Sequence, residues 1–157
     1  MKANKYLMFI LFGILFGGIG FFREYFFHHI NNVMYYMYNG ETTVPVHPAF
    51  SPLLSFSYKT VYYLKYLFTF GFVAVFYFLS VWCVKFYTQD KKLLKWLTYS
   101  YLVLLLLSLI LMLWSYFVAV KLDSDEYSVS RWLMGIAQSP LPALFFIATA
   151  RLNKKLN

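Results

Sequence analysis

The chain has 157 residues, of which 61% are hydrophobic and only 13% are charged. Soluble domains have about half apolar and about a quarter charged residues, so this composition excludes a water-soluble class and indicates a membrane protein. The formal net charge of +8 does not indicate nucleic-acid binding, because the basic residues lie in small groups at the ends of apolar segments.

The first apolar segment, residues 6–22, predicts a membrane-spanning helix. A helix rises about 1.5 Å per residue, so roughly 20 apolar residues cross about 30 Å of hydrocarbon. Lys2 and Lys5 precede the segment as in a signal peptide, but the bulky pair Phe21-Phe22 at its end argues against cleavage. We therefore expect the segment to be retained as the first span.

Two glycines, Gly13 and Gly17, lie four residues apart within this span. This spacing leaves a flat strip on one helix face, where another helix backbone can approach closely. The strip has two interpretations: it packs against a helix of the same chain, or it docks a helix of a partner protein.

Residues 23–59 are predicted to form an aromatic-rich loop after the first span. Arg23 and Glu24 mark the exit from hydrocarbon, because charged groups are costly at the bilayer centre. The helix is free to continue past them until Asn39-Gly40, which is a turn signal. Three prolines farther along exclude a continuous helix through the rest of the loop.

Three further apolar segments have the length of a membrane span. A lysine-rich loop joins the second and third spans, and Asp90 in this loop is a candidate N-cap for the third. The fold class predicted is all-α: one integral membrane bundle of four transmembrane helices in a single domain. The further spans cover residues 60–84, 93–120 and 132–150.

The last predicted span carries small and helix-breaking residues. Gly135 and Ser139 lie four residues apart and predict a second close-packing strip. Pro140 and Pro142 remove two backbone donors, so the helix is expected to kink there.

The basic residues predict the orientation of the bundle. The two terminal tails and the loop from Lys85 to Lys95 hold nine basic residues and one acid, whereas the two other loops, with Lys65 counted among them, hold five of each. Loops rich in Lys and Arg face the cytoplasm. We therefore expect both termini to be cytoplasmic and the 23–59 loop to face outward.

The candidate with most chemical content is Glu24 with His28, one helical turn apart, with His29 and His47 as optional further members; His47 would return from the loop as a third ligand. A carboxylate and two imidazoles are able to ligate a metal or to act as general acid and base. His29 lies about 100° around a helix from His28 and is not expected on that side. The single Cys83 excludes a disulfide or a cysteine metal cluster within one chain.

A second candidate is a polar contact at the outer boundary. Arg23 ends the first span and Arg131 begins the fourth, and Glu24 or the acids of the third loop, Asp123 to Glu126, offer partners. Such a polar contact at the outer membrane boundary is able to bind another protein. The alternative is separate anchoring of each arginine to lipid phosphate or water.

The layout of the chain resembles the small membrane proteins of the exosortase F system-associated type, or a related exosortase accessory. The matching text is Phe21-Phe22-Arg23-Glu24 after the first span, the run Asp90 to Lys95, and Arg131-Trp132-Leu133-Met134 followed by Pro140. The chain departs from that type in Pro142 and in the paired His28-His29.

This resemblance implies a bacterial inner-membrane accessory without an established catalytic residue. We therefore expect a non-enzymatic protein with no cofactor and no metal, packed in the lipid bilayer against a larger, exosortase-like membrane protein. The alternative is a small membrane enzyme, or a lipid- or quinone-binding protein, that uses Glu24, His28 and His47. The contact residues expected for the accessory role are Gly13, Gly17, Gly135 and Ser139 for packing, and Arg23, Glu24 and Arg131 for the polar contact.

Overall fold

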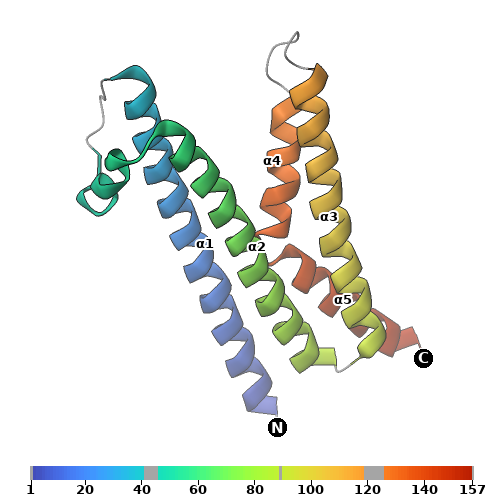
Figure 1. The fold of residues 1–157 in the computed structure, drawn as a ribbon. Coiled ribbons are helices and arrows are strands. Elements are labelled where there is room, and N and C mark those ends of the chain that lie inside the picture. The colour runs from blue at the N-terminus through green and yellow to red at the C-terminus, as the bar shows by residue number, and fades with distance from the viewer. Residues whose placement is uncertain (1, 41–45, 89, 119–125, 157) are drawn as a thin grey trace. The chain divides into compact units, whose positions relative to one another are not determined.

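A computed structural model describes residues 2–40, 46–88, 90–118 and 126–156 (Figure 1). Helices make up almost all of these ranges, and no strand occurs within them. The all-α class is therefore confirmed. The elements are α1 (Lys2–Asn39), the 3-10 helix η1 (Pro48–Ser55), α2 (Tyr58–Thr88), α3 (Lys91–Val118), α4 (Glu126–Ala137) and α5 (Leu141–Leu156).

Three helices, α1, α2 and α3, are long and apolar enough to cross a membrane. The pair α4 and α5 adds a fourth span if the two helices act as one bent segment. Large apolar side chains in the middle of α3, including Leu106 and Ile110, are exposed. Such surfaces require a lipid environment, so the chain is a multi-pass membrane protein.

Helix α1 continues well beyond the charged pair at positions 23 and 24. It ends at Asn39, and Gly40 follows with a φ of 73°, a conformation that favours glycine because it has no Cβ. The Gly40 N–H donates to the Tyr36 carbonyl at 2.9 Å. The predicted Asn39-Gly40 turn is thus confirmed, and the first part of the 23–59 loop is helical.

The chain divides into two compact units, unit 1 (residues 1–72) and unit 2 (residues 73–157), with the boundary inside α2. Unit 1 contains α1, η1 and the first part of α2. Figure 1 shows η1 lying beside the C-terminal half of α1, which it contacts directly.

Unit 1 has its core where η1 meets α1. Five apolar side chains are buried there, three from α1, one from η1 and one from the start of α2. Phe26 and Leu53 pack against them. The buried five are Ile30, Val33, Met34, Phe50 and Val61.

Unit 2 is built on α3, along which α4 packs (Figure 1). Ser108 on α3 and Ser130 on α4 are both buried, and their Oγ atoms are 3.0 Å apart. Each Oγ also donates to the other residue's carbonyl, at 3.2 Å from Ser108 and at 2.9 Å from Ser130. The two helices are therefore joined by directional hydrogen bonds as well as by close packing.

Hydroxyl groups also link α2 to α3 within unit 2. The Tyr101 and Ser80 hydroxyls are 3.0 Å apart and buried. Tyr77 and Thr98 make a second hydroxyl contact at 3.1 Å. The predicted cap of α3 is confirmed, since the Lys92 N–H donates to Asp90 Oδ1 at 2.8 Å.

The predicted kink near the prolines is confirmed and is sharp. Helix α4 ends at Ala137, α5 starts at Leu141, and the two are bent by 60°. Ser139 closes α4, because its Oγ donates to the Ile136 carbonyl at 2.7 Å. Gly135 therefore lies on α4 whereas Ser139 lies in the break, so the two do not share one helix face.

Candidate functional site

The two candidate histidines that meet in the structure are His29 and His47. Their ring centroids are 5.0 Å apart in unit 1. Tyr25 lies edge-on to His29 at 4.4 Å, and Phe50 stacks on His29 at 5.1 Å. We call these four side chains, Tyr25, His29, His47 and Phe50, the histidine cluster.

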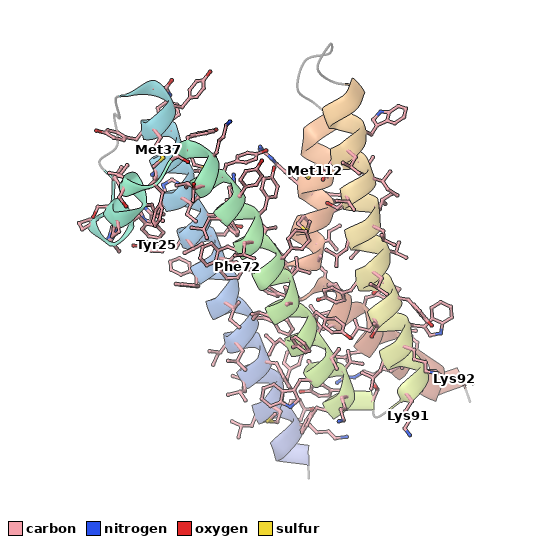
Figure 2. All side chains as sticks on the ribbon, in the orientation of Figure 1. Tyr25, Met37, Phe72, Lys91, Lys92 and Met112 are labelled. Atoms are coloured by element: carbon pink, nitrogen blue, oxygen red, sulfur yellow. The ribbon has the colours of Figure 1, made fainter. Side chains whose placement is uncertain are left out.

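The local sequence explains why these residues converge. Tyr25 and His29 are four residues apart on α1, so their side chains share one face of the helix. Figure 2 shows Tyr25 on the side of α1 beside η1. His47 is the N-cap of η1, and Pro48 follows at the first helical position, where its fixed φ and missing N–H are tolerated. Phe50 then enters the core and holds η1 on α1.

Hydrogen bonds to both ring nitrogens fix the tautomer of His47. The Ala49 N–H donates to His47 Nδ1 at 3.2 Å, so Nδ1 carries a lone pair. In a neutral imidazole the other nitrogen then holds the proton. His47 Nε2 therefore donates to the Tyr25 hydroxyl, which lies 3.3 Å away.

His29 is only partly satisfied. Its Nδ1 atom is buried and has no hydrogen-bond partner among the described residues. Buried polar atoms are usually paired, because leaving one unpaired costs roughly 1–3 kcal/mol. The cluster therefore holds its second imidazole by ring stacking and not by a hydrogen bond from Nδ1.

The residues chosen for the alternative site, Glu24, His28 and His47, engage different partners. Glu24 forms an ion pair with its neighbour Arg23, and its side chain is 71% exposed. His28 Nε2 lies 3.4 Å from Asn32 Nδ2. The hydrogen bonds of His47 go to η1 and Tyr25, as described above. The structure thus brings His47 to His29, and each of the other two has a contact of its own.

No group of three or more His, Cys, Asp or Glu side chains that is able to hold a metal occurs within the described ranges. The two imidazoles of the histidine cluster also have the wrong hydrogen-bond pattern for a shared ion. A ligating histidine normally donates from its second nitrogen to an acceptor. His47 instead accepts from a backbone N–H with that nitrogen.

The residues expected to make the outer polar contact lie in different units. Arg23 and Glu24 are in unit 1 and pair with each other. Arg131 is in unit 2, on α4. Its expected acidic partners include Asp123 and Asp125, which lie outside the described residues.

The glycine strip on α1 is open. Gly13 and Gly17 are both exposed, and a Cβ added at either would meet no heavy atom of the described chain within 4 Å. A Cβ added at Gly135 on α4 would likewise meet no heavy atom of the described chain within 4 Å. In the 18-residue apolar window of α1 only 11% of residues are buried, against 33% for α2.

Sequence reasoning missed the role of His29. It placed His28 beside Glu24 because the two share a helix face, and it assigned His29 to a different side of the helix. The signal that favours His29 is its four-residue spacing from Tyr25, combined with Pro48, since proline is common at the first position of a helix and would make His47 the preceding cap.

Comparison with known proteins identifies no relative. No family model, no curated protein and no solved structure matches the chain.

Proposed function

We propose that this chain is a non-enzymatic accessory that packs in the bilayer against a larger integral membrane protein, of the exosortase type that its layout resembles. The observation that carries the proposal is the open face of α1. Gly13 and Gly17 form a flat, exposed strip in the least buried of the three long helices. Small residues at this spacing let two helix backbones approach closely in lipid.

Several polar side chains are paired with other side chains of the chain, which favours an accessory over an enzyme. Glu24, the acid of the alternative site, is committed to Arg23 and faces solvent, and His28 contacts Asn32. The buried hydroxyls of unit 2 bond to one another across helices. These pairings support structural roles for Glu24, His28 and the buried hydroxyls.

The proposal includes an orientation. Both termini are cytoplasmic, and the segment from Arg23 to Tyr58 faces outward, in the inner membrane of a bacterium. The support is the excess of Lys and Arg in the tails and around the start of α3, where Lys91 and Lys92 lie together (Figure 2). Reporter fusions at the two termini, active only in the cytoplasm, test this orientation.

The test is co-expression and co-purification with an exosortase-type membrane enzyme. Gly13→Leu combined with Gly17→Leu fills the strip and is expected to reduce the recovered partner at least about tenfold, roughly 1.4 kcal/mol in binding free energy. Gly18→Leu is the matched control, because Gly18 also has open space around it but lies about 100° from Gly17 on the helix.

Two results oppose the proposal. If the double leucine variant recovers as much partner as the parent chain, the glycine strip is not the contact surface, and the proposal loses its main support. A chain that purifies with stoichiometric metal or quinone, lost in His28→Ala, favours the alternative enzyme or quinone-binding function.

A further inference from the structure

The hydrogen bond that starts η1 depends on the protonation state of His47. The Ala49 N–H donates to His47 Nδ1 at 3.2 Å, and the other ring nitrogen already holds its proton against Tyr25. A second proton on the ring has only Nδ1 to occupy. Protonated Nδ1–H would then face the Ala49 N–H, two donors would oppose each other, and the N-cap would be lost.

The surroundings of His47 add to this effect. The titratable groups in contact with its ring are Tyr25 and His29, both on α1, and His28 adjoins His29 at 5.5 Å. A charged His47 therefore meets another imidazole at 5.0 Å and no carboxylate among these contacts. Its bond to the Tyr25 hydroxyl survives protonation, since Nε2 donates in both states.

Other charged groups of the described residues lie on these elements. On α1, Glu24 is paired with Arg23. The described residues of η1 include no charged side chain, and the unit 1 part of α2 carries Lys59 and Lys65.

We propose that protonation of His47 removes the N-cap of η1 and thereby weakens the docking of η1 on α1. Protonation takes the acceptor away from the Ala49 N–H, so docking is weaker when the ring is charged. Undocking exposes Phe50, which is buried when η1 is in place. The inference is independent of the proposed accessory function.

The first experiment reads the tautomer directly. The chain has three histidines, so ¹⁵N spectra of the full-length protein in lipid nanodiscs contain three imidazole ring systems, assigned with His28→Asn and His47→Asn variants. At pH 8 the His47 proton is expected on Nε2. A proton on Nδ1 at this pH overturns the proposal.

The second experiment measures docking. Spin labels at Asn31→Cys on α1 and Leu54→Cys on η1, both exposed positions, are placed in a Cys83→Ala background. One narrow distance is expected at pH 8. At pH 5 a broad, longer component appears, with the docked-to-undocked ratio reduced about tenfold by loss of the cap.

A matched variant separates the proposed cause from general acid sensitivity. Asparagine is a favoured N-cap that does not titrate, so His47→Asn is expected to keep the narrow distance at both pH values. His28→Asn is expected to behave as the parent chain. An unchanged distance in the parent chain, or the same acid-induced component in His47→Asn, overturns the proposal.

Discussion

Units 1 and 2 achieve helix contact by different means. Unit 1 is held where η1 meets α1 by rings and aliphatic side chains around Phe50. Unit 2 links α2 to α3 and α3 to α4 with buried hydroxyl pairs such as Ser108–Ser130. Inside a bilayer, apolar contact between helices gains little over contact with lipid, so packing and hydrogen bonds must supply specificity. Unit 2 follows this rule. The core of unit 1 instead joins η1, which lies between α1 and α2 in the chain, to the C-terminal part of α1.

The largest effect is expected from Phe50→Ala in unit 1. Removing a buried Phe side chain costs roughly 3 kcal/mol or more, which is enough to undock η1. Hydrogen exchange of residues 46–57 should accelerate, while peptides of α3 and α4 keep their protection. Phe56→Ala is the control, because Phe56 is 52% exposed. Equal acceleration in both variants would mean that Phe50 does not anchor the segment.

A smaller effect is expected from the serine pair in unit 2. A double-mutant cycle of Ser108→Ala and Ser130→Ala should give a coupling energy of about 0.6 kcal/mol, and at most about 1.7 kcal/mol, as measured for hydrogen bonds between membrane helices. Unfolding in mixed detergent micelles provides the free energies. Ser100→Ala is the control, since Ser100 bonds the Leu97 carbonyl of its own helix. A coupling energy of zero would mean that the serine pair does not stabilise the contact between α3 and α4, so unit 2 would not differ from unit 1 in the proposed way.

The smallest effect is expected from Glu24→Gln. The Arg23–Glu24 pair joins adjacent residues, and the Glu24 side chain is 71% exposed. Exposed ion pairs contribute between zero and about 1 kcal/mol, so the free energy of unfolding should change by no more than about 0.5 kcal/mol. A larger loss, measured by the same detergent unfolding, would indicate that Glu24 has a structural partner beyond Arg23.

Local signals were sufficient for much of the fold. The lengths of the apolar segments predicted the long helices, Asp90 predicted the start of α3, and the prolines predicted the bend between α4 and α5. Each of these features depends on residues within a few positions of one another. The second small-residue strip failed as a continuous face because the bend separates Gly135 from Ser139.

The sequence by itself determined that the chain is helical and membrane-embedded, because hydrophobicity, capping and proline chemistry act locally. Only the tertiary structure decided that His29, and not His28, meets His47. That choice depends on which face of α1 receives η1, and the packing of Phe50 against Ile30, Val33 and Val61 sets it. A contact between residues 18 positions apart in the chain is decided by such burial, which no local pattern specifies.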